Sequence, residues 1–406
     1  MSQQDYPLPS HVPAELAVEF PLTTRKIGYV HPHKEIIPKL HQGRDIVYAT
    51  NIFPVPPGGG WVVRRAEDLK HVYEDTENFI KKGNAQFASM LGESWDAIPT
   101  ELDPPKHTAF RRALEPIFSP RRMAALEQKV SGRAEELIAK FKDKGHVEFI
   151  KEFAVPFPVS IVLDLLGLPQ DRMDEFMGWE HNLLHTGDVE ARRNAVKTLK
   201  DYLYEVIADR KKNPGDDLIS NALTLESEGR KWTEEEVFGH CFNLFIGGLD
   251  TVTANLGWHF HHLATHPEDQ RTLRENPGMI EQAVLELMRA YAAVTTIRIC
   301  AKETELCGVT IKPGDRVALC TPLGSNDPEA FEDPTKVILD RRPAHLSFGH
   351  GIHRCLGAHL ARRELKVAIT DMLAELPEFR LKEGFEVPYL MSNVMHVDKL
   401  ELVWDK

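Results

Sequence analysis

A proline-free stretch from Thr233 to His266 constrains the fold more than any other feature of this sequence. It opens with Thr233-Glu234-Glu235-Glu236, a capping box in which the threonine and the glutamate three residues later satisfy each other's backbone donors. Because the next proline is Pro267, one helix can run for about 30 residues, or about 45 Å at 1.5 Å per residue. A helix of that length must cross a whole domain.

The remaining pattern predicts a mainly α fold with a minor β portion. Residues 121–282 are overwhelmingly helical in character, and apolar side chains recur at helical spacing over 126–141, with Gly145 as a stop. We find no internal repeat, low-complexity linker or change in composition, and therefore expect a single domain over 1–406. The β portion is expected at 45–49, in a hairpin over 306–319 that turns at Pro313-Gly314, and within 387–404.

Composition and charge exclude several classes of protein. Hydrophobic residues make up 42% and charged residues 27% of the 406, as in a soluble globular protein with a core. The formal net charge of -12 argues against a general affinity for nucleic acid or anionic membranes. Residues 1–22 lack the pattern of a signal peptide, and the apolar stretch 155–168 is too short to span a bilayer. We expect a cytoplasmic monomer with no nucleic-acid or membrane partner.

The five cysteines point to a reducing compartment. Their number is odd, which argues against a disulfide framework, and the absence of a CxxC pair makes a structural zinc site improbable. Cys300 and Cys307 lie in stretches predicted as strands, where buried apolar thiols are expected. Cys241, Cys320 and Cys355 complete the set.

Cys355 lies in a loop of a different kind. The sequence Phe348-Gly349-His350-Gly351-Ile352-His353-Arg354-Cys355-Leu356-Gly357 places a cysteine among glycines, beside a histidine and an arginine, just before a helical pattern. A thiolate can be an axial ligand of haem iron. Glycines let the backbone curl around the sulfur so that amide groups point at it. The loop therefore predicts a haem-thiolate protein.

Gly247-Gly248-Leu249-Asp250-Thr251 lies in the middle of the predicted long helix. Two glycines cost roughly 1 kcal/mol each relative to alanine in a helix interior, so another interaction must compensate. One interpretation is a close helix crossing. The other is a groove for a small ligand such as O2, with Asp250 and Thr251 delivering protons. Together with the cysteine loop, the second interpretation is favoured.

Two further patterns are weaker. Glu286 and Arg289, three residues apart, can pair on one helix face, although such pairs usually lie at the surface. His259, His262 and His266 suggest a metal site, but no carboxylate or cysteine accompanies them at ligand spacing. A polar helix end is the better interpretation of these histidines.

These motifs, in this order, resemble the cytochrome P450 family over nearly the whole chain. The resemblance implies a P450 fold, a long central helix over haem b, and Cys355 as the thiolate ligand in a loop that includes Phe348, Gly351 and Gly357. It implies an O2 groove at Gly247 and Gly248, and a buried Glu286–Arg289 pair completed by Arg341 or Arg342. The partners that it implies for the haem propionates are His107 and Arg111, in the segment that begins Asp103-Pro104-Pro105, together with Arg298 and His353.

Within the family the chain looks like the bacterial camphor-hydroxylating branch, with departures. Trp95 stands where that branch has a tyrosine that binds the substrate ketone, and Ala97 stands where it has a phenylalanine. Thr296 replaces an aspartate near Arg298. The changes at Trp95 and Ala97 predict a reshaped pocket for a small terpenoid or ionone-like ketone, whereas the change at Thr296 is expected to act on haem electrostatics. The other residues expected to line it are Asn243, which could bind a carbonyl or simply bond to backbone or water, and the apolar Ile246, Val294 and Val394.

The resemblance implies a monooxygenase that takes O2 and two electrons. Since neither length nor cysteine spacing leaves room for a flavin or iron–sulfur domain, the expected donor is an acidic [2Fe–2S] ferredoxin with an NADH-dependent reductase. Arg112 and Arg354 could provide a basic docking spot, or could be solvated arginines without a partner. The alternatives are a peroxygenase driven by H2O2, camphor itself as the substrate, and a non-catalytic haem sensor or electron carrier.

Overall fold

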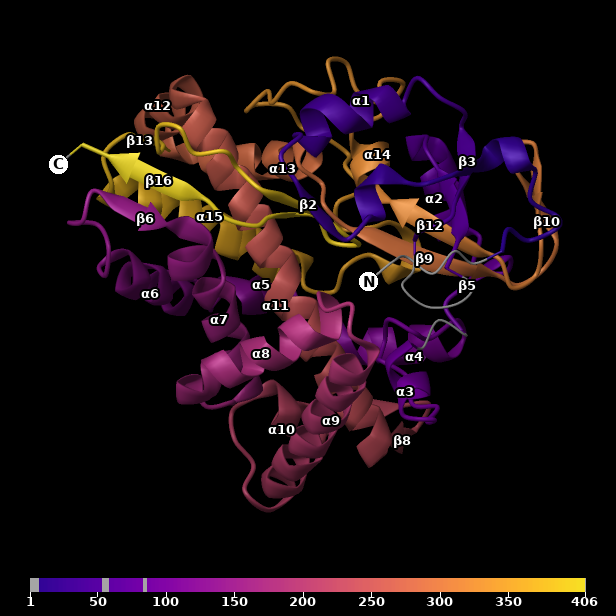
Figure 1. Ribbon diagram of the computed structural model, residues 1–406. Helices are drawn as coiled ribbons and strands as arrows, with labels where there is room; N and C mark the ends of the chain where they lie inside the picture. The colour runs from indigo at the N-terminus through magenta and orange to yellow at the C-terminus, as the bar shows by residue number, and fades with distance from the viewer. Residues whose placement is uncertain (1–6, 53–57, 83–85, 406) are drawn as a thin grey trace. The chain divides into compact units, whose positions relative to one another are not determined.

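The computed structural model describes residues 7–52, 58–82 and 86–405 (Figure 1). The chain forms two compact units. Unit 1 consists of Met1–Ile80, Glu127–Ala154 and Thr251–Lys406, and unit 2 consists of Lys81–Leu126 and Val155–Asp250. Among the described helices, none combines the length and the apolar content that a bilayer crossing requires.

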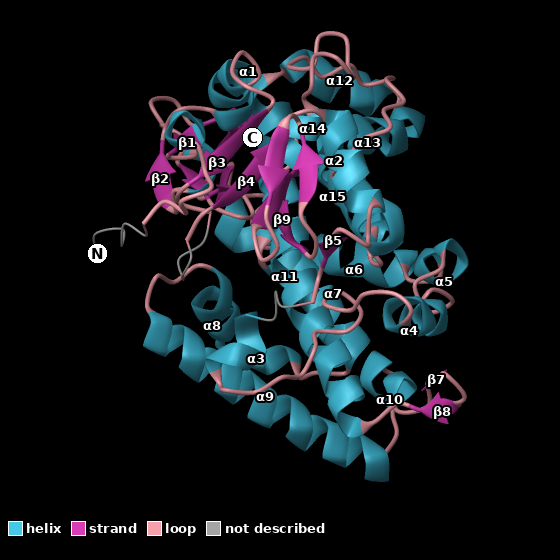
Figure 2. Ribbon diagram, turned by 90° about the vertical axis from the view of Figure 1, so that its right-hand side faces the viewer, coloured by secondary structure: helices cyan, strands magenta, loops and turns pink. Residues whose placement is uncertain are grey.

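Unit 1 contains the main sheet, which has six strands in the order β1-β3-β4-β12-β9-β5. Figure 2 labels β1, β3, β4, β9 and β5 of this sheet; β12 lies between β4 and β9. Strand β1 pairs with β3, and β4 with β12, in parallel; the other neighbours are antiparallel. All four residues of β4 are buried, as expected for an interior strand. The strands are β1 (Ala17–Val18), β3 (Ile46–Ala49), β4 (Gly60–Val63), β5 (Phe79–Ile80), β9 (Thr295–Cys300) and β12 (Arg316–Cys320).

Three smaller sheets complete the β portion of unit 1. One has the strand order β13-β16-β6, a second has the order β15-β14-β2, and the third is the β10–β11 hairpin. The strand-like tail predicted within 387–404 is confirmed by β14, β15 and β16. The bounds are β2 (Lys26–Gly28), β6 (His146–Glu148), β10 (Thr304–Leu306), β11 (Val309–Ile311), β13 (Phe379–Leu381), β14 (Tyr389–Met391), β15 (His396–Val397) and β16 (Glu401–Trp404).

The predicted hairpin over 306–319 is wrong in its pairing. A turn is present at Pro313-Gly314, where Gly314 has a φ of 90°, but β12 pairs with β9 and β4 instead of β11. The hairpin that does form turns at Cys307-Gly308, with φ values of 49° and 74°, as in the turns that suit two-residue hairpins. Cys307 therefore lies in a turn instead of a strand, and it is only half-buried. β12 lies inside the main sheet, where it pairs with both β4 and β9, and this outweighs pairing with β11, its neighbour along the chain.

Seven α-helices of unit 1 lie along and beside these sheets. α15 packs against α6, α13 and α12, and α14 packs against α2. Helix α6 confirms the helical spacing over 126–141, and Gly145, with a φ of 81°, follows it. The helices are α1 (Ile37–Leu40), α2 (Ala66–Glu74), α6 (Glu127–Ile138), α12 (Pro267–Glu275), α13 (Ile280–Ala290), α14 (Thr321–Ser325) and α15 (Ala358–Glu375).

Unit 2 is almost entirely helical. α8 packs against α9 and α7, and the apolar stretch 155–168 forms α7, in which eight side chains are buried. That burial explains its all-round apolar character without a membrane. The elements are α3 (Gln86–Met90), α4 (Lys106–Leu114), α5 (Pro120–Ala124), α7 (Pro156–Leu166), α8 (Met173–Leu184), α9 (Val189–Lys212), α10 (Leu218–Ala222), β7 (Glu226–Ser227) and β8 (Arg230–Lys231).

The predicted long helix is confirmed as α11 (Glu234–Thr265), which has 32 residues and contributes to both units. The capping box forms as expected. The Glu236 amide donates to the Thr233 hydroxyl at 3.2 Å, and the Thr233 amide donates to the Glu236 carboxylate at 2.8 Å. Arg230 adds a bidentate ion pair to the same carboxylate, at 2.7 Å. The start of α11 is therefore fixed by three side chains.

Candidate functional site

The cysteine loop of unit 1 presents a thiol at the start of α15. Gly349 and Gly351 adopt φ values of 69° and 65°, which side chains disfavour. The Cys355 amide donates to the Phe348 carbonyl at 2.8 Å, and the Arg354 amide to the Gly351 carbonyl at 3.1 Å, so the backbone curls on itself. Since α15 begins three residues later, the N-terminal end of its dipole favours the thiolate form of Cys355.

The loop lies against α2, and this contact explains the glycines. A Cβ atom on Gly351 would lie 3.0 Å from the Tyr73 carbonyl oxygen, and one on Gly349 would lie 3.6 Å from the Tyr73 ring. The Nε2 atom of His350 donates to the carboxylate of Glu74, at the end of α2, at 2.7 Å. The loop therefore has a defined conformation before any cofactor is considered.

Among the five cysteines, all in the described part of the chain, Cys355 alone is exposed. Burial raises the pKa of Cys241 to about 12 and that of Cys320 to about 11. Burial and the neighbouring Asp68 raise the pKa of Cys307 to about 12. Burial also raises the pKa of Cys300. These four thiols are thus poor ligands, and Cys355 is the one suited to bind iron.

A buried cation accompanies the thiol in the same unit. Arg298 in β9 is 2% exposed, and its guanidinium lies over the Tyr73 ring at 5.2 Å. It also donates to the Ile297 carbonyl at 3.0 Å. His353, half-buried, ends the short 3-10 turn that precedes Cys355. An exposed thiolate, a buried guanidinium and a histidine are the donors that an iron porphyrin with two carboxylates requires, so these residues fit haem.

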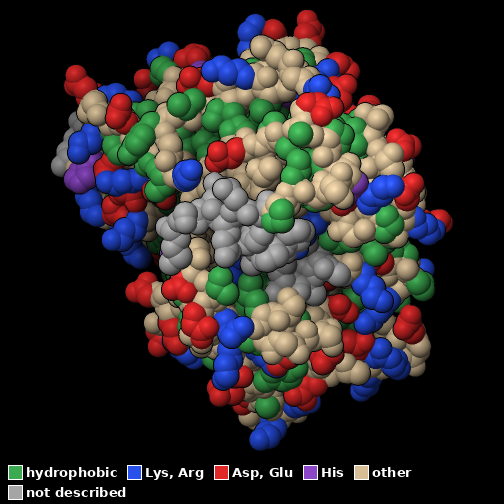
Figure 3. Space-filling view, turned by 45° about the vertical axis from the view of Figure 1, so that its right-hand side comes forward, with side chains coloured by type: hydrophobic (Ala, Val, Ile, Leu, Met, Phe, Trp, Pro, Cys, Tyr) green, Lys and Arg blue, Asp and Glu red, His purple; other side chains and the backbone are tan. Residues whose placement is uncertain are grey.

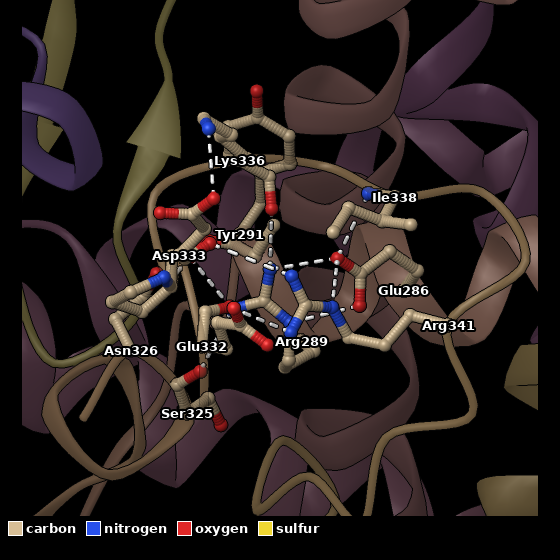
Figure 4. Close-up of polar contacts among 12 residues, drawn as sticks. Glu286, Arg289, Tyr291, Ser325, Asn326, Glu332, Asp333, Lys336, Ile338 and Arg341 are labelled. Atoms are coloured by element: carbon tan, nitrogen blue, oxygen red, sulfur yellow. Dashed lines mark hydrogen bonds and ion pairs between the residues drawn. The ribbon is translucent and has the colours of Figure 1, made fainter. Parts of the chain in front are cut away.

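The Glu286–Arg289 pair is fully buried, so the surface interpretation is wrong (Figure 4). Arg289 makes two hydrogen bonds of 2.8 Å to the Glu286 carboxylate. Its remaining donors reach three backbone carbonyls at 2.7–3.1 Å. Arg341, not Arg342, completes the set with a 3.1 Å bond to Glu286, while Arg342 is exposed. The acceptors of Arg289 beyond Glu286 are the carbonyls of Ser325, Pro334 and Lys336.

The two glycines of α11 have different surroundings. A Cβ on Gly248 would lie 2.7 Å from Val162 of α7, so this glycine permits a close helix crossing. A Cβ on Gly247 would meet nothing within 4 Å, and Gly247 is exposed. The close helix crossing is therefore supported at Gly248, and the groove for a small ligand remains a prediction at Gly247. Next to them, the Thr251 carbonyl accepts a 2.7 Å bond from the Asn255 side chain.

Asp250 is held by an ion pair within unit 2. The Nε2 atom of His185, just after α8, lies 3.4 Å from an Asp250 carboxylate oxygen and 3.2 Å from a Glu180 carboxylate oxygen. Both acids are buried, 4% and 5% exposed at the side chain. Burial alone would lower the pKa of His185, but its bonds to Asp250 and Glu180 raise this pKa to about 10. His185 is therefore a cation at neutral pH.

The other propionate candidates of unit 2 lie on α4. His107 is buried, and Arg111 pairs with Glu115 at 3.2 Å. Asp103, at the start of the same segment, accepts the amides of Lys81 and Lys82 at 2.8 Å each and so anchors the entry to α4.

The side chain of Trp95 contacts α11 through its ring, while its indole N–H is already hydrogen-bonded. The indole N–H donates to Glu93 at 2.7 Å, and the ring packs edge-on against Phe238 and Phe242 at 4.9 and 4.7 Å. The loop that carries Trp95 and Ala97 lies on α11, where the Ile98 amide donates to the Gly239 carbonyl at 3.2 Å. Trp95 thus supplies apolar surface beside α11.

The remaining predicted pocket residues fall into two groups. Asn243 and Ile246 are both half-buried on α11 in unit 2, with Asn243 one turn before Gly247. Val294 and Val394 are brought together in unit 1 by an isolated antiparallel bridge, although 100 positions separate them along the chain.

The histidines at the end of α11 do not form a polar helix end. His259 is fully buried, and His262 is 2% exposed. The two nitrogens of His262 bond to the Tyr291 hydroxyl and the Asp269 carboxylate, each at 2.8 Å. The predicted polar helix end is therefore wrong for His259 and His262, because the spacing of the histidines does not show that Asp269 of α12 and Tyr291 after α13 cover this end of the helix.

Comparison with known proteins identifies the class. The cytochrome P450 family model matches residues 180–388. A probable cytochrome P450 127A1 from Sinorhizobium fredii is 39% identical, over 98% of this chain and 97% of that protein. A vitamin D(3) 25-hydroxylase from Pseudonocardia autotrophica is 31% identical, over 84% and 87%. The chain belongs to the cytochrome P450 family, whose members bind haem through a cysteine thiolate.

Solved structures agree with this assignment. The chain is similar to cytochrome P450 CYP101C1 with a TM-score of 0.87 and 34% identity, covering 98% of this chain and 100% of that one. CYP101J2 gives a TM-score of 0.87, 30% identity and the same coverage. The predicted mainly α P450 fold with a minor β portion is thereby confirmed, and the protein is a bacterial-type P450 monooxygenase.

Two residues of the site were missed from the sequence. Tyr73 touches Arg298 and the cysteine loop, and His185 binds Asp250. Neither lies in a motif, and their partners are more than 60 positions away along the chain. Only the folded chain shows these contacts.

Proposed function

We propose that this P450 hydroxylates a small hydrophobic terpenoid or ionone-like ketone, with O2 and with electrons from a [2Fe–2S] ferredoxin. The observation that carries the proposal is the exposed Cys355 thiol in a preformed glycine loop, in the same unit as the buried Arg298. The relatives named as hydroxylases support the reaction class.

In this proposal the thiolate of Cys355 would hold haem b, and Arg298, His353, His107 and Arg111 would bind its two propionates. Bound haem supplies the O2 chemistry that protein side chains lack. The protein's own part is to hold that group, orient the substrate and control protons. Arg298 is buried before any ligand binds, so its guanidinium is already desolvated for a carboxylate.

Asp250 and Thr251 are the proton-handling pair. The Asp250 carboxylate is bound by the cationic His185, and this ion pair fixes its position on α11. The Thr251 hydroxyl follows directly on α11, and the open face at Gly247 leaves room for a small ligand such as O2.

The substrate pocket is assigned to Trp95, Ala97, Asn243, Ile246, Val294 and Val394. The Trp95 donor is engaged by Glu93, so we assign Asn243 as the group that binds the ketone oxygen. The apolar members match a compact hydrocarbon skeleton better than a fatty acid or a sugar.

The electron donor is assigned to the acidic [2Fe–2S] ferredoxins, served by an NADH-dependent reductase, and the protein is proposed to act as a monomer. Arg112 and Arg354 are both exposed. On the face shown in Figure 3, acidic and basic side chains are interspersed, so docking would depend on a few local cations rather than on overall charge.

The decisive test is optical titration of the ferric holoenzyme with camphor, ionones, other monoterpenoids and fatty acids. We expect a low-spin to high-spin shift with an ionone-like ketone and little with camphor. Asn243→Ala should weaken the ketone's affinity about tenfold, or ~1.4 kcal/mol, while its affinity for the matching alkane stays unchanged. A full shift with camphor would contradict the expected discrimination against camphor. The absence of a shift with every terpenoid would contradict the proposed substrate class.

Thr251→Ala separates the monooxygenase from a peroxygenase. We expect the variant to consume NADH and O2 with reconstituted ferredoxin but to release H2O2 instead of product. Thr253→Ala, a buried threonine two residues along the same helix, is the control and should stay coupled. If Thr251→Ala keeps full coupling, the proton-handling role is wrong.

A further inference from the structure

Tyr73 connects three parts of unit 1 that the family motifs leave separate. Its ring lies under the Arg298 guanidinium, 5.2 Å from ring centre to carbon. Its hydroxyl is 3.2 Å from the hydroxyl of Thr296, which lies in β9 as Arg298 does. Its backbone carbonyl and ring lie directly beneath Gly351 and Gly349 of the cysteine loop.

The environment of Tyr73 leaves little freedom. The side chain is 2% exposed, belongs to the apolar cluster under the main sheet, and has its pKa raised by burial. It is therefore neutral at any physiological pH. A neutral aromatic face attracts a guanidinium without cancelling its charge, whereas a carboxylate in the same place would cancel it.

Thr296 contributes to the same arrangement. A hydroxyl pair between Thr296 and Tyr73 is neutral, so these two side chains add no negative charge beside Arg298. A positive charge near a haem favours its reduced form, because charge and hydrogen bonding around the group set its potential.

We propose that Tyr73 is a positioning residue for the haem: it fixes Arg298 against β9 and supports the cysteine loop, and together with Thr296 it places neutral groups beside the guanidinium. The inference rests on the proposed role of Arg298. It adds a residue outside the recognised motifs, and it links the propionate side of the site to the thiolate side through α2.

The test uses three variants of the holoenzyme and measures the ferric/ferrous midpoint potential and the rate of haem transfer to apomyoglobin. Tyr73→Leu removes the ring, and we expect about tenfold faster haem loss and a lower potential. Tyr73→Phe keeps the ring and should retain haem like the wild type, which is rescue by the conservative variant. Tyr48→Leu is the control, because Tyr48 is also buried and belongs to the same hydrophobic cluster but packs on Trp61.

The charge argument has its own matched pair. Thr296→Asp places a carboxylate beside the Tyr73 hydroxyl, and Thr296→Asn is its neutral isostere. We expect the aspartate variant to have a reduction equilibrium constant about tenfold lower than the asparagine variant, which corresponds to ~59 mV for one electron.

The outcomes separate this inference from the proposal on which it rests. If Arg298→Gln changes neither potential nor haem loss, the proposed role of Arg298 is wrong. If Arg298→Gln changes both but Tyr73→Leu behaves like Tyr48→Leu, only the positioning role is wrong. Thermal unfolding of the haem-free proteins identifies variants that do not fold. If Tyr73→Leu is one of them, the results for Tyr73→Phe and for the two Thr296 variants test the positioning role instead.

Discussion

At the scale of single residues, burial decides what each charged group does. Glu286 and Arg289 form an ion pair with no solvent contact, and the guanidinium of Arg289 also donates to three backbone carbonyl oxygens. Such a pair is weak evidence for added stability, but breaking it leaves a buried charge uncompensated. Its role is to tie α13 to the segment that leads into the cysteine loop.

Glu286→Gln should therefore destabilise the protein by about 3–5 kcal/mol, since Arg289 keeps its charge and loses its counter-ion. Urea unfolding of the haem-free protein measures this. Glu281→Gln is the matched control on the same helix: its pairs with Arg362 and Lys366 are 3.8 and 3.7 Å long and Glu281 is 65% exposed, so the expected change is below about 1 kcal/mol. Equal effects of the two substitutions would show that the burial of the pair has no energetic consequence.

At the scale of elements, α11 shows how one helix serves two needs. It is long enough to contribute to both units, and it gives up side chains at Gly247 and Gly248. Two adjacent glycines destabilise a helix interior, so the sequence predicts that another interaction compensates for them. The structure shows a separate reason for each: contact with α7 at Gly248, and an open face at Gly247.

Alanine substitutions at the two positions should have opposite effects. Gly247→Ala adds a methyl group to open space and should stabilise the helix by about 0.5–1 kcal/mol, while lowering coupled turnover if this face receives O2. Gly248→Ala forces its methyl group into the stiff, β-branched Val162 and should cost about 1–3 kcal/mol. The double variant Gly248→Ala/Val162→Ala should recover part of that loss. Thermal unfolding and product-to-NADH ratios measure both effects, and a stabilising Gly248→Ala would refute the crossing.

At the scale of the whole molecule, unit 1 contains an unusual number of buried histidines. Burial is the main cause that lowers the pKa values of His31, His33, His259 and His261, to about 2, 4, 3 and 3. These side chains are neutral in the folded protein and take up protons on unfolding. Trp258 and Tyr389 stack beside them at 5.3 Å, so the cluster behaves as part of the core.

The acid stability of the protein follows from the signs of these shifts. The folded pKa values lie below the unfolded value of about 6.5, so the contribution is complete above pH 6.5 and is lost as the pH falls toward 4. Each histidine contributes a slope of up to about 1.4 kcal/mol per pH unit. Buried Glu364, whose pKa is raised to about 8, acts in the opposite direction, but one group does not offset four.

Urea unfolding between pH 4 and 8 measures this dependence. His259→Leu removes one group that takes up a proton on unfolding, so the slope of unfolding free energy against pH should fall below pH 6 by about one proton. The substitution breaks no hydrogen bond, because in the described part of the chain neither ring nitrogen of His259 has a partner. Exposed His71→Leu should leave the slope unchanged. A flat profile from pH 4 to 6.5 in the wild type would contradict the argument.

The sequence by itself determined the features that depend on local chemistry. The capping box and the absence of proline placed α11, and the glycines around Cys355 placed the thiolate loop, because conformational preferences and hydrogen bonds between near neighbours need no tertiary context. The order of the motifs was sufficient for the family. Trp95, Asn243 and the propionate residues remain predictions.

Only the tertiary structure decided which distant residues meet. It paired β12 with β9 and β4 rather than β11, selected Arg341 over Arg342, buried His262 between Tyr291 and Asp269, and placed Tyr73 under Arg298. In each case the free energy comes from burial and from partners far along the chain, which compete with local preference. A sequence pattern records the preference of a residue, but the packing of the whole chain selects its partner.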